Sequence, residues 1–343
     1  MKKLLINKQK IENIQNNKFD NINAFKSIVI IGAGLIGGSL ALALRKSNIY
    51  KNCELNCICK NNSELNLLKT TKIFDNISTN ISKAKFINDS DLLIFCAPIS
   101  VIPKMINLIS DKVKDDCIIT DVGSIKKNIY IKLTKTSKSK YIGSHPMTGS
   151  EKSGFENADE YLFENAIVIL TKPNINISDD FNKKLTRLNF FWQSLKCQVK
   201  TLTLDEHDAV VSNISHFPHL TAALIVNTAA QNKTIDNHSY IAFAGGGFKD
   251  TTRIASSNAD LWTEICLFNR QAILKTCKAF KKEFEKVISY LKTQDAQALH
   301  NFFTAAQNNR KQIPVHLKGL LSIAFEIIIN VKDEPGMLGK ITT

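Results

Sequence analysis

The sequence predicts an α/β domain built on a parallel, doubly wound sheet, followed by an all-helical domain. A short β-branched apolar run at residues 27–31 leads directly into a glycine-rich turn and an amphipathic helix pattern. Further apolar runs alternate with helical stretches and indicate a parallel sheet; they cover residues 55–59, 91–97, 117–121 and 141–145. Beyond a strand-like stretch at 166–171, apolar residues recur at helical spacing, through 203–231, 261–292 and 295–307.

The glycine-rich turn has the GxGxxG spacing of a dinucleotide-binding site. Gly32, Gly34 and Gly37 follow the first strand and open the first helix. The first glycine permits a tight turn, the second lets the backbone approach a pyrophosphate, and the third allows close helix–strand packing. We therefore expect a Rossmann-type domain whose cofactor contacts include these glycines together with Leu35 and Ile36 at the helix N-terminus.

The end of the second strand departs from the usual NAD pattern. An acidic residue is expected there to bind the adenine ribose, and this chain has Cys59 and Lys60 instead. Lys60 could pair with a 2′-phosphate, which favours NADP over NAD. The alternative is an NAD enzyme that has lost one contact or takes its carboxylate from Glu64. Pro98, after another strand, is also expected beside the cofactor.

Polar residues gather where the predicted strands end, and ligands of such sheets bind at this edge. Ser124 and His145 are the main candidates, because an imidazole titrates near neutrality and suits general-base work. Each residue also has a simpler interpretation. Ser124 could cap a helix, and His145 could be a strand-end histidine that hydrogen-bonds only to backbone.

The composition limits the function classes. The chain has 343 residues, 44% of them hydrophobic, and a formal net charge of +14. The lysines are scattered without interleaved aromatics, so no nucleic-acid partner is expected and the charge is assigned to a solvated surface. No apolar run approaches the roughly 20 residues of a membrane helix, so no membrane association is expected.

Cysteine usage and the first residues indicate a cytoplasmic protein. Residues 1–25 are rich in Lys and Asn, with no signal-peptide pattern, and are expected to form a poorly ordered leader. Eight cysteines without a secretory signal suggest free thiols in a reducing compartment. Cys53, Cys57 and Cys59 cluster, but no second ligand pair has zinc spacing, so no metal is expected.

Four motifs together resemble the prephenate dehydrogenases, and arogenate dehydrogenases share the pattern. They read DVGSIK at 121–126, HPMTGSEKSG at 145–154, SHFPH at 215–219 and GGGFKDTTRIA at 245–255. The resemblance runs from about Lys26 to the end of the chain. It implies NAD(P)-dependent oxidative decarboxylation of prephenate, or of arogenate, in tyrosine biosynthesis. It also implies that the helical domain binds substrate and pairs with its copy in a homodimer.

The resemblance assigns roles to individual residues. His145 is the proton acceptor and Ser124 hydrogen-bonds the substrate hydroxyl, while Arg253 clamps a substrate carboxylate. Arg253 could instead form an ion pair with Asp250. The remaining expected substrate contacts are His219, its neighbour His216, Ser150 and Glu151. A core-packing histidine is an equal alternative for His216, and Trp262 is assigned to packing.

The helix that carries both histidines is expected to begin at Thr203, where TLDE reads as a capping box. Pro218 between them should kink it.

The expected domain boundaries follow from these motifs. The leader covers residues 1–25, the Rossmann domain 26–154, and the helical substrate and dimerisation domain 155–318. Residues 319–343 resemble the opening of an ACT domain, an amino-acid-sensing module, which is expected to be incomplete in this chain.

Overall fold

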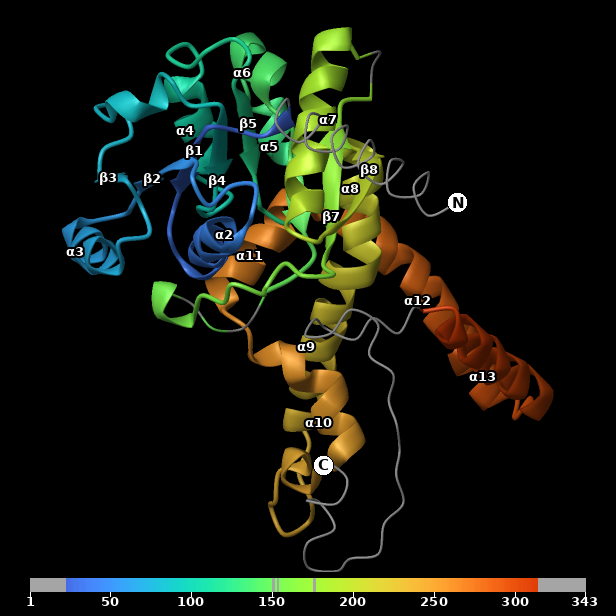
Figure 1. The fold of residues 1–343 in the computed structure, drawn as a ribbon. Helices are drawn as coiled ribbons and strands as arrows, with labels where there is room; N and C mark the ends of the chain where they lie inside the picture. The colour runs from blue at the N-terminus through green and yellow to red at the C-terminus, as the bar shows by residue number, and fades with distance from the viewer. Residues whose placement is uncertain (1–22, 150–151, 153, 175–176, 314–343) are drawn as a thin grey trace, which may run out of the picture.

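The computed structural model describes residues 23–149, 152, 154–174 and 177–313 (Figure 1). Most of the expected leader, Ser150 and Glu151, and the ACT-like segment at 319–343 lie outside this range. Residues near the expected end of the leader belong to the folded body, because Phe25 is 2% exposed and its ring packs edge-on against Phe191 at 5.9 Å.

The first half of the chain forms the predicted parallel sheet. Its five strands are ordered β3-β2-β1-β4-β5, with all four neighbouring pairs parallel. The strands are β1 (Ser27–Ile31), β2 (Glu54–Ile58), β3 (Asn76–Ser78), β4 (Leu92–Phe95) and β5 (Ile118–Asp121). The strand order changes direction between β1 and β4, because β2 and β3 lie on one side of β1 and β4 and β5 on the other. Sheets of this kind bind ligands at the carboxyl ends of the two strands where the order changes direction.

Helices cover both faces of this sheet. They are α2 (Leu35–Lys46), α3 (Asn62–Thr71), α4 (Ile102–Ile109), α5 (Lys127–Ile131) and α6 (Lys135–Lys140), with a 3₁₀ turn at Lys85–Ile87. Both faces of β1 are buried under helices, so every residue of this strand must be suited to the interior. Ile28 and Ile30 enter one buried cluster with residues of α2, while Val29 and Ile31 enter another with residues of α4 and α5.

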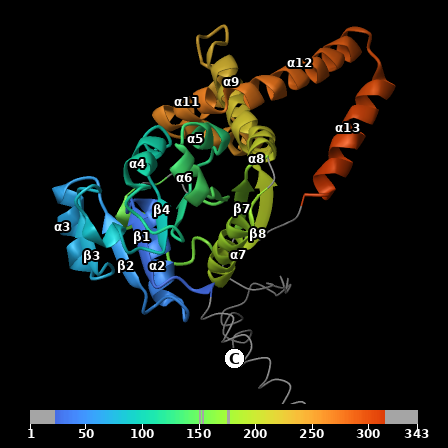
Figure 2. The same cartoon turned by 90° about the horizontal axis from the view of Figure 1, so that it is seen from above.

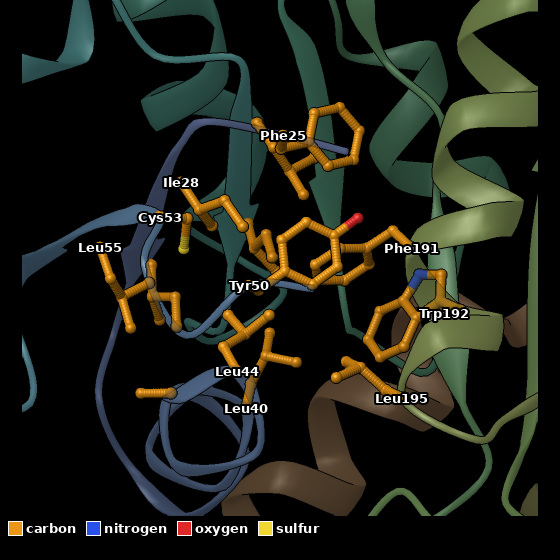
Figure 3. Close-up of a cluster of buried hydrophobic side chains, with 14 of the residues drawn as sticks. Phe25, Ile28, Leu40, Leu44, Tyr50, Cys53, Leu55, Phe191, Trp192 and Leu195 are labelled. Atoms are coloured by element: carbon orange, nitrogen blue, oxygen red, sulfur yellow. The ribbon is translucent and has the colours of Figure 1, made fainter. Parts of the chain in front are cut away.

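A second, three-stranded sheet extends the first domain. Its strands are β6 (Ser144–Pro146), β7 (Ile167–Lys172) and β8 (Gln198–Thr203), with β6 antiparallel and β8 parallel to β7. Helix α7 (Asp179–Ser194) packs Phe191 and Trp192 against Tyr50 and Leu44 of the first domain (Figure 3). Residues 155–203, expected within an all-helical domain, thus hold two strands, because β7 and β8 share this apolar core.

The rest of the described chain is largely helical. Its elements are α8 (Leu204–Val211), a π-helical segment η3 (Ser212–His216), α9 (Phe217–Ala230), η4 (Tyr240–Phe243), α10 (Gly246–Thr252), η5 (Arg253–Ser256), α11 (Ala259–Phe268), α12 (Arg270–Lys292) and α13 (Ala296–Lys311). The last two project away from the sheets (Figure 2). Thr203 caps α8 through the predicted capping box with Glu206. Pro218 lies in the first turn of α9, where the π segment ends.

Helix Leu204–Ala230 is long and apolar enough to cross a membrane by length and composition, which differs from the expectation that no such segment exists. Only 28% of the apolar 18-residue stretch within this helix is buried. The helix also carries the buried polar side chains His207, Asp208, His216 and His219. One such helix is weak evidence for a membrane span.

Candidate active site

The glycine turn after β1 leaves no room for side chains. Gly32 has a φ of +98°, and a Cβ there would lie 2.6 Å from the carbonyl oxygen of Cys96 at the end of β4. A Cβ on Gly37 would lie 2.0 Å from the carbonyl oxygen of Gly32. These distances explain the glycines at both positions, because any larger residue would push the start of α2 off the sheet.

The N-terminus of α2 fits a cofactor phosphate. Gly34 is its N-cap, without a capping side chain, and no acidic residue lies in the first turn. A Cβ on Gly34 would meet nothing within 4 Å. The first-turn amides of Leu35 and Ile36 therefore face no side-chain acceptor, and free amides at a helix N-terminus bind anions. Pro98 is exposed in the turn after β4.

At the end of β2, the expected ribose-binding position has no free carboxylate. Glu64 Oε2 accepts a hydrogen bond from the backbone N–H of Lys60 at 2.8 Å, and Asn61 Oδ1 accepts one from Glu64 N–H. Glu64 is thus engaged in capping α3. The side chain of Lys60 is exposed beside this cap.

His145 lies on β6 at the edge of the second sheet, close to the end of β5. Thr120 is the residue before the last of β5, and Ser144 is the residue before His145. Their hydroxyls are 2.8 Å apart, so β6 lies beside the end of β5. His145 Nδ1 is 2.9 Å from His207 Nε2 on α8. Burial, followed by the charges of His207 and Lys126, holds the pKa of His145 well below its usual value. His145 is therefore neutral at pH 7, as a proton acceptor must be.

A buried ion pair between Asp121 and Lys126 fixes the loop that carries Ser124. Asp121 accepts hydrogen bonds from the Gly123 amide, from Lys126 Nζ at 2.5 Å and from the Tyr141 hydroxyl at 2.6 Å. Burial lowers the pKa of Lys126, and Asp121 opposes that shift. Because Asp121 and Lys126 are both fully buried, removing either would leave an uncompensated charge.

Ser124 is not a helix cap. The N-cap of α5 is Lys126, which makes no side-chain cap, and the amides of Lys126 and Lys127 donate instead to Asp208 on α8, at 3.0 and 3.1 Å. Ser124 is half-buried. The simpler interpretation of this serine is therefore removed.

His216 and His219 both contact the indole of Trp262, from α11. The His219 ring stacks on it with centroids 3.4 Å apart, and the His216 ring lies edge-on at 6.1 Å. Asn269 joins this cluster to α8, because its Nδ2 donates to the Asp208 carbonyl and lies 3.1 Å from His216 Nδ1. His216 Nε2 is buried and has no partner in the described part of the chain. That nitrogen is a buried polar atom left without a hydrogen bond in this part of the chain.

Arg253 lies apart from these contacts, at the start of η5. Its side chain is exposed, and within residues 23–149, 152, 154–174 and 177–313 it forms no ion pair with Asp250 or another acid. The guanidinium is thus uncommitted. The segment η5 itself packs against α9, the helix that carries His219.

The structure joins the loop of Ser124 to His145 through residues that the sequence analysis did not select. His207 and Asp208 form this link, and Trp262 and Asn269 support the other two histidines. The available signal was the adjacent His-Asp pair on a helix already known to carry two candidate histidines. Among the described residues, no group of three His, Cys, Asp or Glu side chains could hold a metal.

The fold and the site define a class of protein, a nicotinamide-dependent dehydrogenase with a Rossmann domain and a helical second domain. Residues 40–201 match the family model for the prephenate dehydrogenase nucleotide-binding domain, and residues 203–305 match that for the prephenate dehydrogenase dimerization domain. The chain belongs to the prephenate dehydrogenase family, and it is an NAD(P)-dependent oxidoreductase.

Individual relatives agree with this assignment. The chain is 33% identical over 320 residues to a prephenate dehydrogenase of Bacillus subtilis, covering 92% of this chain and 84% of that relative. The prephenate dehydrogenase of Aquifex aeolicus, crystallised with hydroxyphenyl propionate and NAD+, has a TM-score of 0.77 at 27% identity, covering 84% of this chain and 98% of that one. Synechocystis arogenate dehydrogenase has a TM-score of 0.71 at 25% identity, covering 83% and 99%.

Proposed function

We propose that this chain oxidises and decarboxylates prephenate to 4-hydroxyphenylpyruvate in tyrosine biosynthesis, with NAD(P)+ as hydride acceptor. Membership of the prephenate dehydrogenase family supports the reaction. The observation that supports the site is the neutral imidazole of His145, buried beside the end of β5, from which the loop of Ser124 begins.

The reaction asks little of the protein beyond positioning. When bound, NAD(P)+ would supply the acceptor for the hydride that leaves the ring carbon bearing the hydroxyl. The bond to the ring carboxylate breaks, carbon dioxide leaves, and its electron pair completes the aromatic ring. His145 Nε2 accepts the hydrogen bond of the substrate hydroxyl, which raises the electron density on oxygen as the hydride departs. His145 returns the proton that it accepts to the phenol oxygen of the product, so no net proton is released.

Ser124 is proposed to donate to or accept from the same hydroxyl and so hold it against His145. The Asp121–Lys126 pair beneath the loop supports this role, because it fixes the backbone on both sides of Ser124. Ser124 then orients the substrate, while His145 remains the group that accepts the proton.

Arg253 and His219 are proposed to bind substrate carboxylate and keto groups, with His216 as their neighbour. The free guanidinium of Arg253 can grip a carboxylate with two parallel hydrogen bonds. The buried Nε2 of His216, which lacks a hydrogen-bond partner among the described residues, supports a place beside the ligand. Ser150 and Glu151 belong to this proposal on sequence grounds alone, since they lie outside the described residues.

The cofactor is proposed to be NAD or NADP, with Lys60 favouring NADP. Glu64 is engaged in capping α3, so no free carboxylate at the end of β2 would repel a 2′-phosphate. The Aquifex relative was crystallised with NAD+, and NAD is the alternative cofactor for this chain.

The chain is proposed to act as a cytoplasmic homodimer. Residues 203–305 match a dimerization domain, and large apolar side chains are exposed along it. They include Leu224, Phe243, Leu267, Phe284, Leu291 and Phe303. An exposed apolar surface of this kind marks an interface. The ACT-like likeness of residues 319–343, and with it any response to tyrosine, stays a prediction from sequence.

Arogenate is the second candidate substrate, favoured by the structural likeness to Synechocystis arogenate dehydrogenase. The experiment offers prephenate and arogenate, each with NAD+ and NADP+, to the purified chain and follows reduced nicotinamide by absorbance. We expect turnover with prephenate, faster with NADP+. Turnover with arogenate but not with prephenate would make arogenate the substrate. No turnover in any of the four mixtures would contradict the proposed function.

A further inference from the structure

A continuous line of hydrogen bonds runs from the proposed proton acceptor to the start of α5. His145 Nδ1 lies 2.9 Å from His207 Nε2, and His207 Nδ1 lies 2.7 Å from Asp208 Oδ1. The two carboxylate oxygens of Asp208 also accept the backbone amides of Lys126 and Lys127. His207 and His145 are 0% and 8% exposed, so solvent does not compete for these bonds.

The acceptor at the end of this line decides where each proton lies. An ionised carboxylate only accepts, so His207 carries its proton on Nδ1 and its Nε2 holds a lone pair. That lone pair can only accept, so His145 in turn carries its proton on Nδ1. The remaining lone pair of His145 is then on Nε2, the nitrogen that has no partner among the described residues.

We propose that His207 and Asp208 are positioning residues that fix His145 in its Nδ1–H tautomer and thereby keep its Nε2 available to the substrate hydroxyl. This inference rests on the proposed function of His145 as proton acceptor. His207 does not touch the substrate, and it acts through the tautomer and the orientation of its neighbour. In the Ser-His-Asp triad a carboxylate holds the base histidine in its working tautomer, and here a second imidazole stands between the carboxylate and the base.

The surrounding charges support a neutral His207. Burial is the largest influence on its pKa and lowers it, while Asp208 on the same helix opposes the shift. Lys126 from the loop before α5 adds a repulsive charge, and Asp121 from β5 an attractive one. Neutrality matters because a protonated His207 would donate from Nε2 and force His145 into the opposite tautomer.

The helix α8 and the π segment that continues it explain why these groups meet. The capping box at Thr203 fixes the start of α8, and so places His207 and Asp208 in its first turns against the amides of α5. His216, at the end of the π segment, faces the same cluster and contributes a charge that lowers the pKa of His145. His216 is held by Asn269 and is not part of the line to Asp208.

Two substitutions at one position separate this role from simple packing. In His207→Gln, the amide oxygen can reach the place of Nε2 and accept from His145 Nδ1–H. In His207→Asn, the shorter side chain can reach only the place of Nδ1, so His145 loses its acceptor. We expect His207→Asn to lower kcat about 100-fold or more with KM for prephenate within about threefold, and His207→Gln to stay within about tenfold of wild type. The exposed His300, changed to Gln, is the matched control and should leave kcat unchanged.

Equal losses in the Gln and Asn variants, or a wild-type kcat in His207→Asn, would overturn the proposal. Because either variant could fold poorly, ¹⁵N NMR of histidine-labelled wild-type protein provides a second test that needs no turnover. A protonated Nδ1 and a bare Nε2 on His145 are expected, and the reverse would overturn the proposal. Wild-type protein that shows this tautomer but does not oxidise prephenate would contradict only the proposed function.

Discussion

His219 and Trp262 stack face to face, with ring centroids 3.4 Å apart and planes inclined by 12°. The two residues come from α9 and α11, and the indole also contacts His216 edge-on. Trp262 was assigned to packing from the sequence. It does pack against the core, and its indole in addition contacts both histidines that are proposed to lie near the substrate.

Replacing Trp262 should therefore weaken substrate binding more than turnover. We expect Trp262→Ala to raise KM for prephenate about tenfold, because an aromatic pair of this kind contributes about 0.5–1.5 kcal/mol. Trp262→Phe keeps a ring for His219 and should stay within about threefold. Steady-state kinetics with varied prephenate measure both effects, and an unchanged KM in Trp262→Ala would remove the indole from the site.

Arg253 is exposed and has no acidic partner among the described residues, so its loss should not disturb the fold. We expect Arg253→Gln to raise KM for prephenate strongly with a modest change in kcat. The KM of Arg253→Lys should lie between those of the wild type and Arg253→Gln, because a lysine keeps the charge but loses the paired hydrogen bonds. The thermal midpoint should be unchanged. A wild-type KM in Arg253→Gln would exclude the carboxylate clamp.

Cofactor preference should respond to Lys60. In Lys60→Asp, a carboxylate stands where the 2′-phosphate would lie, so the ratio of kcat/KM for NADP+ to that for NAD+ should fall at least tenfold. Lys60→Gln tests the loss of charge without repulsion and should give a smaller shift. An identical ratio in all three proteins would show that this side chain does not face the ribose.

Stability should fall as the pH is lowered below about 6.5. Burial is the main cause that lowers the pKa values of four histidines, His145, His207, His216 and His219. The pKa of His216 is lowered to about 4. Below 6.5 the unfolded chain therefore binds more protons than the native one, and stability is lost down to the folded pKa. For His216 alone the loss between pH 7 and pH 5 is about 2 kcal/mol.

Urea unfolding at pH 7 and pH 5 measures this loss. His216→Asn, whose amide oxygen can still accept from Asn269, should reduce the difference between the two pH values. A wild-type free energy of unfolding that does not change between pH 7 and pH 5 would contradict the burial of neutral histidines.

The parts of the fold set by local pattern could be predicted from sequence. The strand–glycine–helix unit at 27–46 and the capping box at Thr203 depend on residues close in the chain. The strand β7 corresponds to the strand-like stretch at 166–171, whereas β8 is less apparent, because it is largely exposed and is fixed by pairing with β7 and by packing of α7 and α8. Such pairing depends on tertiary context.

The site shows the same limit. His145 and Ser124 stand out because they follow predicted strands, whose ends must meet at one edge of the sheet. His207 and Asp208 do not stand out, since their partners are 62 residues away at His145 and 82 residues away at Lys126. No spacing in the sequence predicts those contacts.

His145→Asn tests most directly whether His145 accepts the substrate hydroxyl proton in this member of the prephenate dehydrogenase family. Turnover of prephenate should be measured with the preferred nicotinamide, alongside cofactor affinity by fluorescence titration. The account predicts a fall in kcat of about 10²–10⁴-fold with cofactor affinity unchanged, because only the proton acceptor is removed. A variant that binds cofactor normally and retains wild-type kcat would contradict it.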